Sequence, residues 1–156
     1  MINKLKIFNR KATFKEYIKN KRIALVGPAN YLNFFEFGKI IDSYDLTARV
    51  NRGLELVKNN EKKVGSKTDI LFNCLIEHYD NGGKINIKEL KSNNVKWICT
   101  IPRSDYYGNS ISNRLNKGVN LITIFKLKLL FNFHIFDYKS YDQLNKKVKC
   151  RSNTGF

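Results

Sequence analysis

The chain has 156 residues, of which 42% are hydrophobic and 13% are aromatic. This length predicts one domain, and this apolar content predicts a buried core and excludes a disordered chain. The formal net charge is +16, but lysine greatly outnumbers arginine and the lysines are scattered along the chain. We therefore interpret the charge as a basic solvated surface, which favours anionic substrates, and consider a nucleic-acid interface the weaker reading.

Strand and helix patterns alternate along the chain. Short apolar runs predict five strands, at residues 22–27, 46–51, 69–75, 96–101 and 119–125. Helical patterns are found at residues 11–20, 34–41, 87–93, 109–117 and 140–147. Residues 52–68 form a polar connection, and 81–83 a turn. Strands separated by helices predict a single α/β domain over residues 1–156, with a mostly parallel sheet and helices on both faces.

The cysteines and the N-terminus bear on the compartment. Cys74 and Cys99 lie in apolar runs, and the three cysteines, with Cys150, are too widely spaced for a metal site or a disulfide framework. We expect Cys74 and Cys99 to be buried core residues in a reducing compartment. The chain shows no secretory signal, and its most apolar stretch, 121–136, contains lysines. These features predict a cytoplasmic chain without a transmembrane segment, although a membrane anchor on a longer parent polypeptide stays open.

The first candidate site element is the exit of the first strand, Gly27-Pro28-Ala29-Asn30. In open α/β sheets, ligands bind where the chain leaves the carboxyl ends of the strands. Gly27 lets the backbone pass close to a ligand, and the small Ala29 keeps the loop thin. Alone, this element also fits any tight strand exit.

The second element is the segment from Asp42 to Asn51. Asp45 and Arg49 flank the entry of the second strand and could pair to fix its register, which would be a structural role. Asn51 lies at the exit of that strand, beside the Gly27 loop if the first two strands are neighbours. Its amide could donate to a phosphate oxygen, or Asn51 could simply cap a turn. The third element, Val64 to Asp69, precedes the third strand and could be only a turn.

Together, the three elements resemble the large sialylmotif of the sialyltransferases, glycosyltransferase family 29. The matching positions are Val26, Gly27, Gly38, Ile41, Asp42, Asp45, Arg49, Asn51, Val64, Gly65, Lys67, Thr68 and Asp69. The resemblance is good over residues 21–75. A second match lies at residues 151–156, R-S-N-T-G-F, which are similar to the opening of the family's small sialylmotif.

The resemblance implies a Rossmann-like fold, a variant of the glycosyltransferase A type, here as the N-terminal portion of a longer catalytic domain. It implies transfer of sialic acid from CMP-sialic acid to a glycan hydroxyl, with inversion and without a cofactor or a divalent metal. Carried over by position, Gly27, Pro28, Ala29 and Asn30 would line the CMP phosphate and ribose, and Asn51 would bond the phosphate. Ser152, Thr154 and Gly155 would approach the nucleotide from the opposite side.

Two of the departures from the family bear directly on binding and catalysis. Pro28 stands where family members often have asparagine, so one donor to the phosphate is lost unless Asn30 replaces it. The family's catalytic histidine lies beyond the small sialylmotif, and neither His78 nor His134 matches it. We expect His78 to be an exposed loop residue and His134 to be packed, which leaves the catalytic residue unknown. We therefore expect weak or absent turnover from these 156 residues.

Two other functions remain open. The chain could be a remnant that binds a cytidine nucleotide without catalysis, or a basic nucleic-acid-binding module, for which Tyr106 and Tyr107 beside Arg103 are the only suggestive patch. The acceptor glycan, the linkage and the donor sugar, sialic acid or another CMP-linked keto-acid sugar, are not specified by the sequence.

Overall fold

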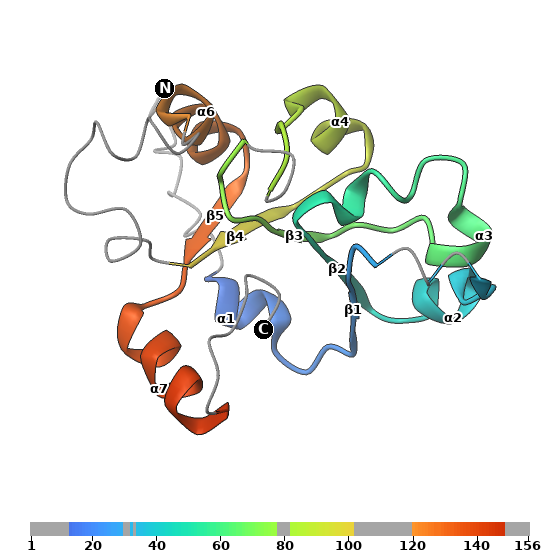
Figure 1. Cartoon of the computed structure of the whole chain (residues 1–156), viewed down its shortest axis with the longest axis horizontal. Coiled ribbons are helices and arrows are strands. Elements are labelled where there is room, and N and C mark those ends of the chain that lie inside the picture. The colour runs from blue at the N-terminus through green and yellow to red at the C-terminus, as the bar shows by residue number, and fades with distance from the viewer. Residues whose placement is uncertain (1–12, 30–31, 33, 78–81, 102–119, 149–156) are drawn as a thin grey trace, which may run out of the picture.

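A computed structural model describes residues 13–29, 32, 34–77, 82–101 and 120–148. Its centre is a five-stranded sheet in which every pair of neighbours is parallel. The strands are β1 (Ile23–Val26), β2 (Leu46–Val50), β3 (Ile70–Phe72), β4 (Trp97–Thr100) and β5 (Asn132–Ile135). They lie in the sheet in the order in which they occur in the chain (Figure 1). All carboxyl ends of the strands therefore meet at one edge.

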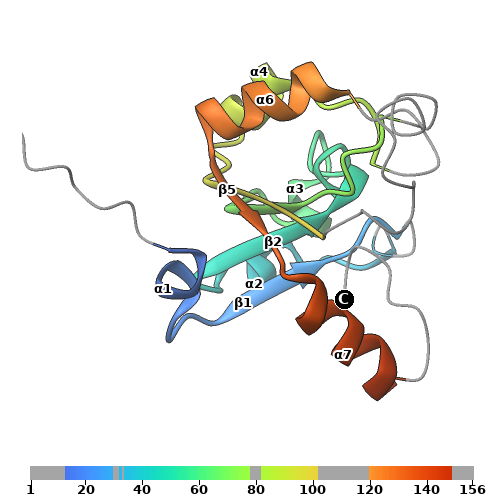
Figure 2. The same cartoon turned by 90° about the vertical axis from the view of Figure 1, so that its left-hand side faces the viewer.

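Short helices connect or flank these strands. They are α1 (Phe14–Ile18), α2 (Gly38–Asp42), the 3₁₀ helix η2 (Asn51–Leu54), α3 (Glu61–Val64), α4 (Ile87–Ser92), α6 (Leu121–Leu130) and α7 (Tyr138–Val148). Figure 2 shows α4 and α6 on one side of the sheet and α1 and α7 on the other. The predicted α/β class, with a parallel sheet and helices on both faces, is confirmed.

The two faces are built by alternate residues of the same strands. Ile70 packs with Phe14 of α1, whereas its neighbour Leu71 packs with Leu90 of α4 and Leu127 of α6. Because successive side chains of a strand point to opposite faces, a strand buried on both faces is usually apolar throughout. β3 (I-L-F) and most of β4 (W-I-C-T) follow this rule. β1 and β2 do not, because Leu25 of β1 is 56% exposed and β2 buries the polar residues Thr47 and Arg49.

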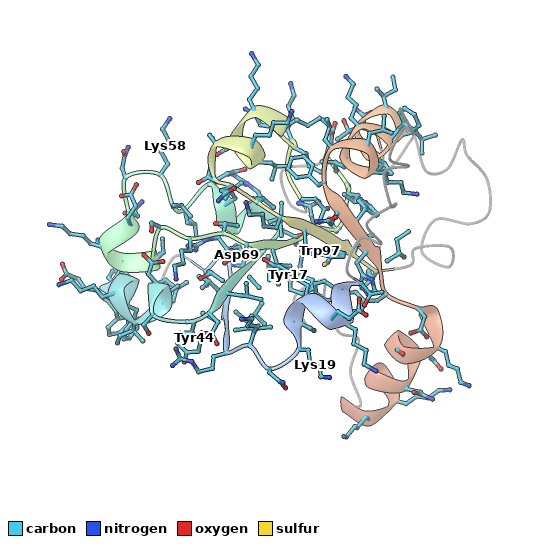
Figure 3. All side chains as sticks on the ribbon, turned by 180° about the vertical axis from the view of Figure 1, so that it is seen from behind. Tyr17, Lys19, Tyr44, Lys58, Asp69 and Trp97 are labelled. Carbon is cyan, nitrogen blue, oxygen red and sulfur yellow. The ribbon has the colours of Figure 1, made fainter. Side chains whose placement is uncertain are left out.

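An aromatic cluster lies on the face of the sheet that α1 covers. Tyr17 of α1 lies 5.7 Å from Trp97 of β4, centroid to centroid, and Phe14 lies 5.3 Å from the same ring. Figure 3 shows Tyr17 and Trp97 together on this side of the sheet, with Asp69 nearby. Burial, and secondarily the negative charge of Asp69, raises the pKa of Tyr17. The capping box between Thr13 and Glu16 begins α1 and so positions these rings.

One predicted strand is wrong. Residues 121–130, which overlap the strand predicted at 119–125, form helix α6, and the fifth strand is β5 at 132–135. Asn120 begins the helix, because its side chain accepts a hydrogen bond from the backbone N–H of Thr123 at 3.0 Å. The segment is apolar on every side of the helix, so it lacks the periodicity that distinguishes a helix from a buried strand.

The remaining predicted elements agree with the structure to different degrees. α1, α4 and α7 fall on predicted helices, and α2 covers the second half of the helix predicted at 34–41. The polar connection 52–68 contains most of η2 and all of α3. The helix predicted at 109–117 lies outside the described residues. Within the described part of the chain, no helix has the length and apolarity required to cross a membrane.

Candidate functional site

The exits of β1 and β2 are neighbours at the carboxyl edge of the sheet. Val26, the last residue of β1, is paired with Arg49 of β2, so the chain leaves both strands within about one residue of the same level. Gly53 confirms this proximity, since a Cβ placed on it would lie 3.6 Å from the carbonyl oxygen of Val26 and 4.0 Å from the carbonyl carbon of Gly27. The predicted convergence of Gly27 and the Asn51 turn is therefore present. We call the exits formed by Gly27, Pro28, Ala29 and Asn51 the cradle.

Open space adjoins the backbone at Gly27. A Cβ placed on Gly27 would meet no atom within 4 Å, so the side of Gly27 on which a side chain would project is open. Pro28 is exposed, and Ala29 is half-buried. Asn30, the next predicted site residue, lies outside the described residues. A ligand could therefore approach the main chain at Gly27 closely.

The side chain of Asn51 is held in one orientation. Its Oδ1 accepts a hydrogen bond from the backbone N–H of Cys74 at 3.0 Å, which ties the exit of β2 to the exit of β3. The backbone of Asn51 is left-handed, with φ of 49°, a conformation that asparagine tolerates better than most residues. Because the oxygen is used in this bond, the NH₂ group is the part of the amide that remains to donate to a ligand.

Asn73 is a second asparagine at this edge, which sequence reasoning missed. Its Oδ1 accepts from the backbone N–H of Leu75 at 2.7 Å, and its Nδ2 donates to the carbonyl of Gly82 at 3.2 Å. Asn73 is only 1% exposed, so we assign it a structural role, fixing the left-handed turn at Leu75. Its position directly after a buried strand is the signal that could have identified it.

A cavity of about 30 Å³ lies beside the cradle, between Asn51, Asn73 and Leu90. That volume suits about one water molecule. A nucleotide would therefore have to lie on the open side next to Gly27 and not inside this cavity.

Two acidic residues of the motif lie at the opposite edge of the sheet. Asp45 precedes β2 and accepts from the backbone N–H of Arg22 at 2.8 Å, and Asp69 precedes β3 and accepts from the backbone N–H of Thr47 at 2.8 Å. Each carboxylate thus bonds the beginning of the preceding strand in the sheet. The hydrogen bond from Arg22 and the charges nearby lower the pKa of Asp45. These residues set strand register and are remote from the cradle.

The suggested pair of Asp45 and Arg49 is not formed. Four residues of a strand span about 13 Å, so the two side chains cannot meet. Asp45 lies instead beside Arg22, with 3.7 Å between Nε and Oδ2. Its role in register is retained, but through the beginning of β1.

Arg49 is buried and bonds main-chain oxygens. Nη2 donates to the carbonyls of Val64, Gly65 and Lys67 at 2.9, 3.0 and 3.0 Å, and Nε donates to Thr68 Oγ1 at 2.9 Å. The side chain is fully buried. Burial lowers the pKa of Arg49 to about 10, against a smaller opposing effect of Asp42. Arg49 therefore holds the loop that precedes β3 against β2.

Asp42 and two glycines complete this connection. Asp42 accepts hydrogen bonds from the backbone N–H groups of Ser66 and Lys67, at the beginning of the same loop. Gly65 has φ of 74°, and a Cβ there would lie 2.8 Å from Asp42 Oδ1. A Cβ on Gly38 would lie 2.1 Å from the carbonyl oxygen of Glu61, so α2 and α3 touch there. Most of the matched motif is therefore a scaffold, and only its two strand exits form the cradle.

The other predicted residues lie apart from the cradle or outside the described chain. His134 is packed as expected, 4.7 Å from the ring of Phe14 and on β5, at the far edge of the sheet from β1. Cys74 and Cys99 are buried, as predicted. Ser152, Thr154, Gly155, Cys150 and His78 lie outside the described residues, as does the patch at 103–107. Among the described residues, no group of three or more His, Cys, Asp or Glu side chains could hold a metal ion.

An all-parallel sheet with two adjoining strand exits and an orientated amide defines an α/β protein with a candidate site at the carboxyl edge of its sheet. The sequence model of glycosyltransferase family 29 (sialyltransferase) matches residues 2–121. That range covers more than half of the chain and includes β1 to β4 and the cradle, so the chain belongs to this family. No curated protein matches the chain. The segment at 151–156 lies beyond the family match, and its likeness to the small sialylmotif stays a prediction.

Proposed function

We propose that the cradle binds the phosphate of a CMP-sugar donor and that the chain is the donor-binding part of a sialyltransferase-like glycosyltransferase. Membership of the family supports glycosyl transfer in general. The observation that carries the specific proposal is the orientation of Asn51, whose Oδ1 is bonded to Cys74 and whose NH₂ group is left for an anion. Open space at Gly27, on the neighbouring strand exit, leaves room for the nucleotide.

Departure of CMP requires only hydrogen-bond donors to its phosphate at the cradle. CMP is a good leaving group when donors stabilise the negative charge that develops on its phosphate, and a neutral amide can supply that stabilisation. Transfer would also need the donor and acceptor held in position and a base to remove the acceptor proton. His134 lies in the aromatic cluster under α1 and does not supply such a base at the cradle. We accordingly expect binding without appreciable turnover from these residues.

The substitution Asn51→Asp tests the proposal. Aspartate keeps an oxygen that can accept from the backbone N–H of Cys74, and it also tolerates the left-handed backbone. It replaces the NH₂ donor with a carboxylate oxygen, which repels phosphate. We expect the affinity for CMP, measured by isothermal titration calorimetry, to fall by about tenfold or more, because a charge-assisted hydrogen bond becomes a repulsion.

Cytidine, which has no phosphate, is the matched ligand control. Its affinity should be nearly the same for the natural chain and for Asn51→Asp. An equal loss of affinity for CMP and for cytidine would mean that the substitution disturbs the fold. An unchanged affinity for CMP would mean that Asn51 does not bind the phosphate. Measurable transfer or hydrolysis of CMP-sialic acid by the natural chain would contradict the expected lack of turnover but not the donor site.

A nucleotide-binding remnant without catalysis is the second candidate. It shares the CMP site and differs only in lacking transfer. Assays with a longer reading frame that supplies a further histidine would separate the two, since added residues restore transfer only if this chain is part of an enzyme.

A further inference from the structure

The outward face of α6 is apolar and uncovered. Ile122, Phe125 and Leu129 are 68%, 64% and 65% exposed, and their spacing of three and four residues aligns them on one side of the helix. The inward side, at Leu127, is fully buried against the sheet. The exposed stripe is therefore not required for the core, and it places three large apolar side chains in water.

Basic residues flank this stripe. Lys126 and Lys128 are exposed, and at 100° per residue they fall on either side of the line through Ile122, Phe125 and Leu129. The helix itself contains no acidic residue. α6 is not an amphipathic helix of the usual membrane-surface type, because its inward side is also apolar and packs on the sheet. Its exposed apolar side chains could enter the acyl boundary of an anionic membrane while the flanking lysines face the headgroups.

The surface beside α6 continues this charge. Figures 1 and 2 place α4 next to α6 on the same side of the sheet, and α4 carries the exposed Lys88 and Lys91. A hollow of about 300 Å³ opens at the end of α6, between Lys91, Lys96 and Leu130. Lys96 Nζ donates to Asn94 Oδ1 there. A hollow of this kind could accept an anionic headgroup while the stripe enters the acyl region.

We propose that the stripe of Ile122, Phe125 and Leu129, with its flanking lysines, docks the protein on an anionic lipid membrane. The formal charge of +16 favours an anionic surface over a neutral one. α6 has ten residues, so it lies on the membrane and does not cross it. The cradle is formed by β1 and β2, at the far side of the sheet from β5, and docking leaves it open.

Vesicle sedimentation tests the docking. The purified chain is mixed with vesicles of phosphatidylcholine alone or with about a third phosphatidylserine, and the bound fraction is measured. We expect binding only to the anionic vesicles. The triple variant Ile122→Ser, Phe125→Ser, Leu129→Ser should reduce the partition coefficient by about tenfold or more, because it removes the buried apolar area. Lys126→Glu with Lys128→Glu should reduce it by at least about fivefold for each lysine.

Lys39→Glu with Lys62→Glu is the matched charge control, because both lysines are exposed on α2 and α3, away from α6. If this control weakens binding as much as the α6 pair does, the binding reflects net charge and the proposal fails. It also fails if the serine variant binds normally, or if no vesicle binds the natural chain. If the stripe instead joins two copies of the chain, the serine variant will convert a dimer to a monomer in analytical ultracentrifugation, and docking on lipid is overturned.

Tryptophan fluorescence tests whether the stripe enters the lipid. Phe125→Trp places an indole in the stripe, while the natural Trp97 is buried in the core. Anionic vesicles should shift the emission of this added indole to shorter wavelength, and lipids brominated on the acyl chain should quench it. Binding without quenching would mean adsorption by charge alone, which contradicts the role given to the apolar stripe.

Discussion

The carboxylate of Asp42 accepts the backbone N–H of Ser66 through both of its oxygens, at 3.0 and 2.9 Å. This contact joins the end of α2 to the loop before β3, across 24 residues of chain. Burial opposes the ionised form of Asp42, but the hydrogen bonds from Ser66 and Lys67 outweigh it and lower the pKa of the carboxyl group from its ordinary value of 3.8. The negative charge of Asp42 is therefore part of what stabilises this loop.

The first prediction concerns acid sensitivity. A carboxyl group with a lower pKa in the folded chain stabilises the fold fully above its unfolded pKa, and this contribution is lost as the pH falls through its folded pKa. Asp42→Asn should reduce the free energy of unfolding by about 1–2 kcal/mol at neutral pH. In urea titrations, the difference from the natural chain should persist at pH 6 and shrink below about pH 4. A difference that does not depend on pH would show that the charge is unimportant.

Substitution by alanine should destabilise the fold at one glycine of the motif and have little effect on stability at another. Gly38→Ala places a methyl group 2.1 Å from the carbonyl oxygen of Glu61, which belongs to a backbone that cannot move freely. The free energy of unfolding should fall by about 3 kcal/mol or more. Gly27→Ala meets nothing and should change stability by less than about 0.5 kcal/mol.

Gly27→Ala also reports on the cradle. Because the added methyl group enters the space proposed for the nucleotide, affinity for CMP should fall although the fold is unchanged. Thermal unfolding with and without CMP measures both effects in one experiment. Normal CMP affinity in this variant would place the nucleotide away from the first strand exit.

Arg49 should prove to be a residue of the fold. Arg49→Met removes the donors to the carbonyls of Val64, Gly65 and Lys67 and leaves these oxygens buried without partners. We expect a loss of about 3–5 kcal/mol in urea unfolding. Arg49→Lys retains the charge and some of the bonds, so its loss should be smaller. If instead Arg49→Met folds normally but fails to bind CMP, Arg49 belongs to the donor site.

Local patterns in the sequence predict the first four strands, although β2, L-T-A-R-V, contains a threonine and an arginine and is not a continuous apolar run. The partners of Arg49 could not be predicted in this way, because most of them are main-chain oxygens, 15 to 18 residues later, which no side-chain pattern marks. An aspartate and an arginine four residues apart form an ion pair readily in a helix, where the two side chains lie on one face. In a strand the same spacing holds the two residues far apart. The motif identifies the family without indicating that most of its residues are structural.

The boundary between α6 and β5 illustrates a second limit. Residues 121–130 are mostly apolar, and neither a period of two nor one of 3.6 residues stands out among them. The alternation in F-N-F-H-I at 131–135 was a signal for β5. The α6 helix is apolar inside and outside, which is the same feature that supports docking on a membrane. Asn120 was the available local signal, because asparagine is favoured at the N-cap of a helix.

The two described cysteines should be unreactive in the folded chain. Burial strongly raises the pKa of the Cys99 thiol, and Cys74 is only 2% exposed, so neither sulfur is accessible to a reagent in solvent. Iodoacetamide at pH 8 should label both cysteines in urea and neither in buffer, as measured by peptide mass mapping. Rapid labelling of Cys74 in buffer would mean that the turn between Asn73 and Leu75 opens readily.

His134 gives a prediction that separates a packed residue from a catalytic one. Its ring stacks on Phe14 at 4.7 Å, with 21° between the planes, and burial lowers the pKa of His134. The folded state therefore prefers the neutral imidazole. This contribution to stability is complete above the unfolded pKa of 6.5 and is lost as the pH falls through the lower folded pKa.

The variant His134→Phe tests this role. It retains the stack on Phe14 but lacks the titrating group, so the free energy of unfolding of the variant should change less between pH 7 and pH 5 than that of the natural chain. CMP affinity should be the same in both proteins, because the ring lies on β5 and the cradle on β1 and β2. A variant that loses CMP binding, or whose unfolding keeps the same pH dependence, would assign His134 a different role.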